Sequence, residues 1–203
     1  MIAIVDYGMG NIRSVTNAFR SLGAEISVTR DKDVITGAQA LVLPGVGAFG
    51  KCVENLKRFE LFDFLKTQIA AGKPYLGICL GMQILLESSE EAPGVEGMGI
   101  IKGRVVRFQG DMKIPHMGWN NVEIKKPGKM FDNIPDGSHF YFVHSFYPAP
   151  EDAAVTATTT DYCGVRFTSA IQRDSIFASQ YHPEKSQAIG LRLLRNFVNL
   201  CDS

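Results

Sequence analysis

Residues 73–83 read Lys73-Pro74-Tyr75-Leu76-Gly77-Ile78-Cys79-Leu80-Gly81-Met82-Gln83. The apolar run 75–78 predicts a buried strand, and residues 80–87 predict a helix. Cys79 lies between them, with one glycine two positions before it and another two positions after it. This is the pattern of a strand–turn–helix elbow, with sulfur in place of the serine oxygen of G-x-S-x-G. The turn needs small neighbours because the backbone at its centre is tightly folded.

The rest of the first half alternates strand-like and helix-like segments in the same way. We expect strands at 2–6, 25–29 and 40–43, and helices at 12–22, 53–59 and 61–71. Asn11 is a suitable N-cap for the first helix, which Gly23 ends. Apolar strands separated by helices indicate βαβ units and therefore a parallel sheet.

After about residue 95 the pattern changes to short strand-like pieces rich in β-branched and aromatic residues. These pieces lie at 100–108, 119–124, 140–143, 153–159, 162–167 and 175–179, and a final helix follows Ser186. No repeat, low-complexity segment or linker divides the chain. We therefore expect an α/β fold in one domain, residues 1–203, with a mostly parallel central sheet flanked by helices. A smaller mixed or antiparallel sheet is added to it.

Composition narrows the class of function. The chain has 203 residues, of which 45% are hydrophobic, enough for an ordinary core. Lys and Arg together number 21, and so do Asp and Glu, so the formal net charge is zero. This balance argues against a general binder of nucleic acid or anionic membranes, because the affinity of such proteins comes from excess basic side chains. Low self-repulsion is also compatible with a protein partner.

The remaining global signals predict a cytoplasmic protein. Residues 1–6 lack the basic region and apolar run of a signal peptide, and no apolar stretch reaches the roughly 18 residues that span a bilayer. The four cysteines show no C-x-x-C spacing and are expected to be reduced thiols. No close pairing of cysteine and histidine predicts a zinc site. We expect no metal and no cofactor.

Cys79 is the first candidate catalytic residue. The elbow places it at the N-terminus of a helix, where the partial positive charge favours a thiolate. The next backbone N–H, that of Leu80, would point to where an oxyanion forms. The alternative interpretation is a buried structural cysteine at a turn flanked by glycines.

His182 and Glu184 form the second candidate. They lie two residues apart after the expected strand 175–179, so in an extended segment their side chains emerge on the same side. The carboxylate could hold one imidazole nitrogen and leave the other for a thiol. A lone histidine in a loop is more often solvated or a helix cap, but the elbow elsewhere in the chain favours catalysis.

Glycine-rich turns follow two other strands. Pro44-Gly45-Val46-Gly47 is commonly an ordinary turn between a strand and a helix. Beside the elbow it becomes a candidate second oxyanion donor, through the backbone around Val46 and Gly47. The segment Gly8-Met9-Gly10-Asn11 lacks the complete dinucleotide fingerprint and the Walker Gly-Lys-Ser/Thr, so we predict no nucleotide site.

These motifs together resemble those of the class I (triad) glutamine amidotransferases, through residues 77–83 and His182-Pro183-Glu184. Within that class, the chain is most similar to the family of glutaminase subunits of imidazole glycerol phosphate synthases. The further matching motifs span nearly the whole chain and lie at residues 6–11, 44–47, 115–120, 141–145 and 182–186.

The resemblance implies hydrolysis of glutamine to glutamate and ammonia through a cysteine thioester. Cys79 would be the nucleophile, His182 the general base and acid, and Glu184 the residue that orients the histidine. Backbone N–H groups of Leu80, Val46 and Gly47 would hold the oxyanion. By the same resemblance, the residues that contact glutamine are Gln83, Glu91, His144 and Ser145.

The resemblance also implies a partner, a (β/α)8-barrel cyclase, with which the chain would form a heterodimer. Ammonia would pass through the barrel and convert a phosphoribulosyl formimino precursor into imidazole glycerol phosphate and aminoimidazole carboxamide ribotide, in histidine biosynthesis. Asn11, Trp119, Asn120 and Lys185 match positions that face the partner. Without the resemblance, Trp119 would be taken as a core aromatic residue of a strand.

The resemblance further implies that glutaminase activity is nearly silent until the partner binds its ligand. A flip of the backbone at residues 44–47 is a physical candidate for this control, since glycines make such a flip inexpensive.

Three alternatives remain open at the level of sequence. The chain could be a class I glutaminase that serves the synthesis of GMP, anthranilate or pyridoxal phosphate, although the motifs at 115–120 and 143–145 disfavour this. It could be a cysteine hydrolase that needs no partner, in which case the isolated chain would turn over esters or peptides. It could also be a non-catalytic subunit, whose usual sign is a missing member of the triad.

Overall fold

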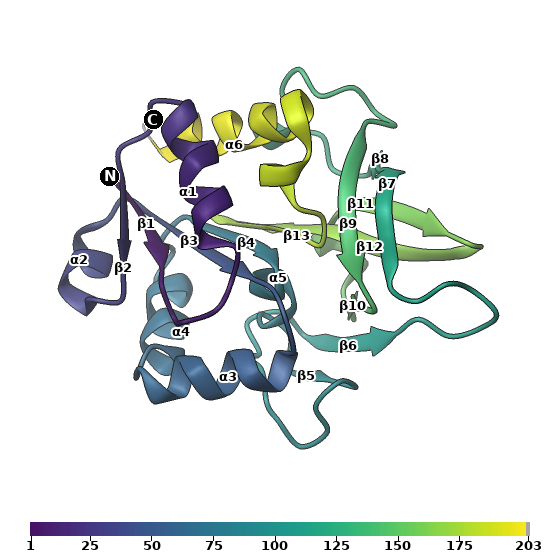
Figure 1. Cartoon of the computed structure of the whole chain (residues 1–203), viewed down its shortest axis with the longest axis horizontal. Coiled ribbons are helices and arrows are strands. Elements are labelled where there is room, and N and C mark those ends of the chain that lie inside the picture. The colour runs from purple at the N-terminus through teal and green to yellow at the C-terminus, as the bar shows by residue number, and fades with distance from the viewer. Residues whose placement is uncertain (202–203) are drawn as a thin grey trace.

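The computed structural model describes residues 1–201, and its centre is one eight-stranded sheet in the order β2-β1-β3-β4-β13-β12-β11-β8 (Figure 1). The first five strands in this order are mutually parallel and the last three are antiparallel. The parallel strands are β2 (Ile26–Thr29), β1 (Ile2–Val5), β3 (Ala40–Gly45), β4 (Tyr75–Cys79) and β13 (Ile176–Ser179). The antiparallel strands are β12 (Val165–Arg173), β11 (Thr156–Tyr162) and β8 (Glu123–Ile124).

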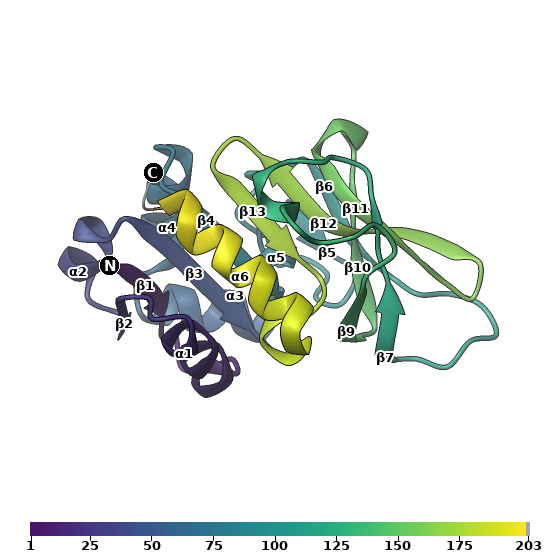
Figure 2. The same cartoon turned by 90° about the horizontal axis from the view of Figure 1, so that it is seen from above.

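Helices cover both faces of the parallel part. One face carries α1 (Ile12–Ser21) and α6 (Gln187–Cys201), and the other carries α3 (Phe49–Arg58) and α4 (Phe62–Ala70), as Figures 1 and 2 show. The alternation of side chains along β1 explains why both faces need cover: Ile2 and Ile4 join the core under α1 and α6, whereas Ala3 and Val5 join the core under α3 and α4. The short helices α2 (Lys32–Gly37) and α5 (Leu80–Gln83) complete this half.

Two small sheets lie beside the antiparallel strands. One joins β10 (Phe146–Pro150), β6 (Gly103–Arg107) and β5 (Ser88–Ser89), and the other pairs β7 (His116–Asn121) with β9 (His139–His144). Strands β7 and β9 stand at the end of the molecule opposite β2 (Figures 1 and 2). Short 3-10 turns lie at η1 (Lys129–Phe131), η2 (Ala153–Val155) and η3 (Pro183–Lys185).

The expected α/β fold with a mostly parallel sheet is confirmed, with differences of detail in the added sheets and in the helices. The antiparallel strands β12, β11 and β8 extend the central sheet, and the remaining strands make two small sheets instead of one. The helix expected at 80–87 ends at Gln83, because backbone carbonyls that follow it accept from another segment. The N–H groups of Met98, Gly99 and Ile101 donate to the carbonyls of residues 84–86.

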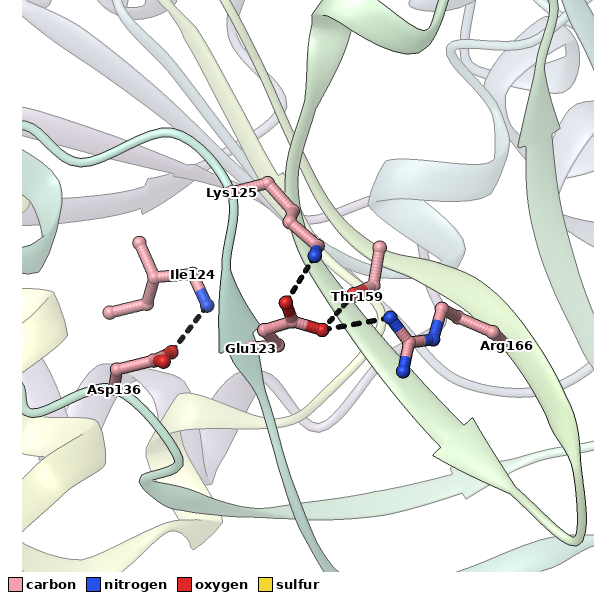
Figure 3. Close-up of polar contacts among 6 residues, drawn as sticks. All are labelled: Glu123, Ile124, Lys125, Asp136, Thr159 and Arg166. Carbon is pink, nitrogen blue, oxygen red and sulfur yellow. Dashed lines mark hydrogen bonds and ion pairs between the residues drawn. The ribbon is translucent and has the colours of Figure 1, made fainter.

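The outer edge of the sheet, at β8, carries charges. Glu123 accepts from Arg166 at 3.0 Å and also pairs with Lys125, while Asp136 accepts the backbone N–H of Ile124 at 2.7 Å (Figure 3). The Lys125 ammonium, and after it Arg166, holds the pKa of Glu123 below its usual value. These exposed pairs add little stability, but charges on an edge strand discourage pairing with another sheet.

Three further observations concern residues 1–201 alone. No helix in that range is long and apolar enough to cross a membrane. No three His, Cys, Asp or Glu side chains there gather in a way that could hold a metal ion. None of the four cysteines is joined in a disulfide, and Cys52 and Cys79 are buried whereas Cys163 is exposed.

Candidate active site

The elbow expected from residues 73–83 is present at the junction of β4 and α5. Cys79 has a φ of 55°, in the left-handed region that non-glycine residues seldom adopt, at a typical cost of about 1–3 kcal/mol. A Cβ on Gly77 would lie 2.5 Å from the carbonyl oxygen of Gly81, and a Cβ on Gly81 would lie 1.9 Å from that of Leu43. The two glycines therefore let the elbow pack against β3 and hold Cys79 in its strained conformation.

Replacing Gly81 tests this packing. We expect Gly81→Ala to lower the free energy of unfolding by about 3 kcal/mol or more, because the added methyl group overlaps the backbone of β3. Gly37→Ala is the matched control, since a Cβ there meets nothing within 4 Å, and it should change stability by no more than about 0.5 kcal/mol. Urea unfolding followed by circular dichroism measures both. Equal stability of the two variants would contradict the tight elbow.

His182 and Glu184 meet as the sequence predicts, directly after β13. The Nδ1–H of His182 donates to Oε1 of Glu184 at 2.9 Å, and both side chains are only 1% exposed. Burial by itself lowers the pKa of His182, but the neighbouring Cys79 and Glu184 side chains outweigh it and raise the pKa to about 10. Since Nδ1 is occupied, Nε2 is the nitrogen left to exchange a proton with Cys79. The raised pKa favours a protonated imidazole beside the thiol.

A pocket of about 240 Å³ opens over the thiol, smaller than the sites that hold drug-sized ligands. Every residue predicted as nucleophile, oxyanion donor or substrate contact lines it. The predicted residues that line it are Val46, Gly47, Cys79, Leu80, Gln83, Glu91, His144 and Ser145. Pro115, Val143 and Phe146 also line the pocket. The fold thus brings residues up to about a hundred positions apart in the sequence together in one small pocket.

Two of the predicted substrate contacts already hold the pocket wall. Oε2 of Glu91 accepts the backbone N–H of Phe49 at 2.7 Å, at the start of α3 directly after the turn that contains Val46 and Gly47. Nε2 of Gln83 donates to the carbonyl of Phe146 at 3.1 Å. Each side chain keeps a second polar atom that these bonds do not use.

His144, the third predicted contact, lies in a chain of hydrogen bonds that fixes its tautomer. Its Nδ1–H donates to the carbonyl of Phe146 at 2.9 Å, so its Nε2 accepts from Nδ1 of His116 at 3.0 Å. Nδ2 of Asn120 then donates to Nε2 of His116 at 3.3 Å. Burial lowers the pKa of His144 to about 3 and that of His116 to about 4. Both rings are therefore neutral at neutral pH.

One residue at the thiol was missed by the sequence reasoning. Gln180 is fully buried, and its Nε2 donates to Sγ of Cys79 at 3.4 Å. The signal that could have found it is spacing, because it lies two residues before His182 and extended segments place such residues on one side.

The residues predicted to face a partner divide into two groups. Trp119 is 47% exposed and lies edge-to-face on Tyr141, over whose ring Nζ of Lys185 lies at 5.7 Å. Trp119 is therefore not a core residue. Asn120 lies on the other face of β7, where it bonds His116 and the carbonyl of Asp161.

Asn11, the fourth residue predicted to face a partner, occupies the N-cap position of α1. Its side chain makes no capping hydrogen bond, so the expected capping interaction is absent. Helix α1 packs against η3, the turn that contains Lys185.

Comparison with known proteins places these features in a family. A family model for glutamine amidotransferase class-I matches residues 3–200. The imidazole glycerol phosphate synthase subunit HisH of Syntrophotalea carbinolica is 49% identical over 207 residues, which cover 98% of this chain and all of that protein. The protein of the same name from Methanothermobacter thermautotrophicus is 51% identical, over 98% of each chain.

Solved structures agree on the fold. One described as a glutamine amidotransferase matches with a TM-score of 0.78 at 19% identity, over the full length of both chains. The structure of PurLQS from Thermotoga maritima matches with a TM-score of 0.76 at 20% identity, over 98% of this chain and 97% of that one. The match of the family model over nearly all of the sequence, with relatives about half identical along their whole length, shows that this chain belongs to the class-I glutamine amidotransferases.

Proposed function

We propose that the chain is the glutaminase subunit of an imidazole glycerol phosphate synthase and acts in histidine biosynthesis. The observation that carries this proposal is the full-length similarity, at 49% and 51% identity, to two proteins that both bear the name of that subunit. The pocket adds the chemistry, since it combines a cysteine elbow with a buried histidine–glutamate pair. We take residues 1–203 as one amidotransferase domain.

The reaction uses the three side chains in sequence. The thiolate of Cys79 attacks the carboxamide carbon of glutamine and forms a C–S bond. His182 gives its Nε2 proton to the amide nitrogen, so the C–N bond breaks and ammonia leaves a thioester behind. His182 next takes a proton from water, which attacks the thioester carbon and releases glutamate and the thiolate. Glu184 holds Nδ1 throughout and keeps the imidazole in the reactive orientation.

Backbone and polar groups of the pocket have supporting roles in this scheme. The N–H of Leu80, with the backbone at Val46 and Gly47, receives the negative oxygen of each tetrahedral intermediate. Gly47 has a φ of 102°, so this turn uses a conformation that favours glycine and can flip. Glu91 takes the ammonium group of glutamine, a role that suits its negative charge.

Gln83, His144 and Ser145 complete the contacts with glutamine. Both ring nitrogens of His144 are already hydrogen-bonded, to Phe146 and to His116, so we expect it to contact glutamine through its backbone or the edge of its neutral ring. The pocket therefore provides one charge for the substrate ammonium and otherwise neutral polar groups.

The partner in this proposal is a (β/α)8-barrel cyclase in the cytoplasm. Ammonia released at Cys79 passes through the barrel to the phosphoribulosyl formimino precursor, and no cofactor is needed. The proposed contact surface includes Asn11, Trp119, Asn120 and Lys185. The exposed Trp119, backed by Tyr141, has the character of an interface anchor.

The rate of glutamine hydrolysis with and without the barrel partner tests the proposal. We expect slow hydrolysis by the isolated chain and a rise of at least about tenfold when the partner and its ribotide ligand are both added. No rise on adding both would contradict the assignment to this synthase. Hydrolysis of esters or peptides by the isolated chain would instead favour a hydrolase that needs no partner.

Two surface variants test whether Trp119 contacts the partner, one at Trp119 and one as a control at Val28. Trp119→Ala should raise the partner concentration needed for half-maximal activation by about 30-fold, the value of about 2 kcal/mol at an interface hot spot. Val28→Ala removes another exposed apolar side chain, 40% exposed, on β2 at the opposite end of the molecule. It should leave that concentration unchanged.

A further inference from the structure

The side chain of Gln180, a residue outside the triad, lies next to the thiol of Cys79. It follows β13, is fully buried, and its backbone N–H is held by the carbonyl of Ser169 at 2.9 Å. Its side-chain Nε2 donates to Sγ of Cys79 at 3.4 Å. A fully buried carboxamide within hydrogen-bonding distance of a nucleophile needs an explanation beyond packing.

The orientation of the Gln180 carboxamide is fixed by its other end. Oε1 accepts from Nε2 of Gln83 at 2.9 Å, and the same nitrogen of Gln83 donates to the carbonyl of Phe146 at 3.1 Å. A flipped carboxamide would set two NH₂ groups against each other and lose the bond to Gln83. The NH₂ group of Gln180 therefore faces Cys79 and cannot turn away without leaving a buried donor unpaired.

We propose that Gln180 is a positioning residue that holds the Cys79 thiolate by hydrogen bonding to Sγ. The role rests on the proposed function, because it takes Cys79 as the nucleophile. A buried thiolate is stabilised by donors that reach it, and a neutral amide supplies one without forming a second ion pair that would compete with His182. Donation from Gln180 also restricts the direction of Sγ.

Other groups around the thiol do not supply the same contact. Several titratable side chains interact with Cys79 or line its pocket: His182, Tyr7, Cys52, Glu91 and His144. Burial raises the pKa of Tyr7 above its ordinary value and that of Cys52 to about 12, so both are neutral at neutral pH. The cation at the thiol is His182. Gln180 is the neutral side-chain donor that the described contacts give to Sγ.

The first test measures alkylation of Cys79 by iodoacetamide as a function of pH, with the modified peptide identified by mass spectrometry. Gln180→Glu keeps an acceptor for Gln83 but sets a carboxylate against the thiolate. We expect it to move the midpoint of the pH–rate profile upward by about one unit and to slow alkylation at neutral pH about tenfold. Gln180→Met removes the donor at similar length and should move the midpoint in the same direction by less.

Asn196→Leu is the matched control. Asn196 is also buried, and its carboxamide donates to the carbonyls of Met130 and Asp132, away from the pocket. Its alkylation profile should superimpose on that of the original protein even if its melting temperature falls. Profiles of both Gln180 variants that also superimpose on the original would overturn the proposal.

A second measurement needs no change at Gln180. In the intact chain, the side-chain amide resonances of Gln180 should shift with pH at the midpoint found for alkylation of Cys79. In Cys79→Ala that transition should be absent. Resonances that do not respond to ionisation of the thiol would overturn the proposal, even if the Gln180 variants fail to fold.

The rate of glutamine hydrolysis by the complex shows whether a failure lies in the role of Gln180 or in the proposed function. With the barrel partner and ribotide present, Gln180→Glu should lower kcat about tenfold with a smaller change in KM, because the thiol and not substrate binding is affected. Shifted alkylation profiles without any glutamine hydrolysis by the original protein would sink the proposed function alone. Normal hydrolysis by the original protein, with unshifted profiles in the variants, would sink only the role of Gln180.

Discussion

Cys79→Ala should abolish synthesis that depends on glutamine while leaving synthesis from added ammonium salts intact in the complex with the barrel partner. The substitution removes the atom that forms the thioester, so no amide nitrogen is released. We expect a loss of at least about 10⁴-fold in glutamine-dependent turnover. The cyclisation step lies in the partner and needs only ammonia. Imidazole glycerol phosphate formed from each nitrogen source measures the two activities.

Cys163→Ser is the control for this prediction. Cys163 is an exposed thiol between β11 and β12 that does not line the pocket, and its loss should change neither activity. If Cys79→Ala loses both activities in a correctly assembled complex, Cys79 does more than attack glutamine. If it keeps both, Cys79 is not the nucleophile.

Glu184→Gln should lower glutamine-dependent turnover by about 10²–10³-fold, less than the loss in Cys79→Ala. The carboxylate is one of the two groups that raise the pKa of His182 to about 10, so its replacement by a neutral amide lowers that pKa. The imidazolium that pairs with the thiolate becomes less favoured, yet nucleophile and base both remain. Steady-state kinetics gives the turnover, and NMR titration of the His182 ring gives the direction of the pKa change.

Glu54→Gln is the matched control, since Glu54 pairs with Lys51 at 2.7 Å on the exposed face of α3. It should leave turnover unchanged. A complete loss in well-folded Glu184→Gln, equal to that of Cys79→Ala, would contradict the division of roles between nucleophile and orienting carboxylate. An unchanged pKa of His182 would contradict the electrostatic role of Glu184.

The sequence predicted the strands of the parallel half because most of them are apolar runs, although it missed the short helix α2. It missed β10, since Pro148 and Pro150 lower the strand signal. The structure tolerates them because β10 is the edge of its small sheet and, among the described strands, pairs with β6 alone. The early end of α5 was also hidden, because the N–H groups that bind the carbonyls of residues 84–86 come from the next loop, at residues 98–101, and not from the same helix.

The functional residues that could be predicted are those recognised by their spacing to near neighbours in the sequence. The elbow fixes Cys79, and the two-residue interval fixes His182 with Glu184. The contacts of Gln180 and His116 depend instead on how separate strands meet. Gln180 reaches Cys79 because β13 lies beside β4, and His116 reaches His144 because β7 and β9 pair in that register. A single segment does not show which strands meet, although the two-residue spacing between Gln180 and His182 is a local hint.

Transfer of the amide nitrogen itself tests the central claim most directly. The complex is supplied with glutamine labelled with ¹⁵N in its amide, together with an excess of unlabelled ammonium and the ribotide precursor. If ammonia is released at Cys79 and passes inside the complex to the partner, imidazole glycerol phosphate carries ¹⁵N in nearly every molecule. If the product carries label only in proportion to the mixed ammonia in solution, or none, the account of this chain as the glutaminase half of that synthase is contradicted.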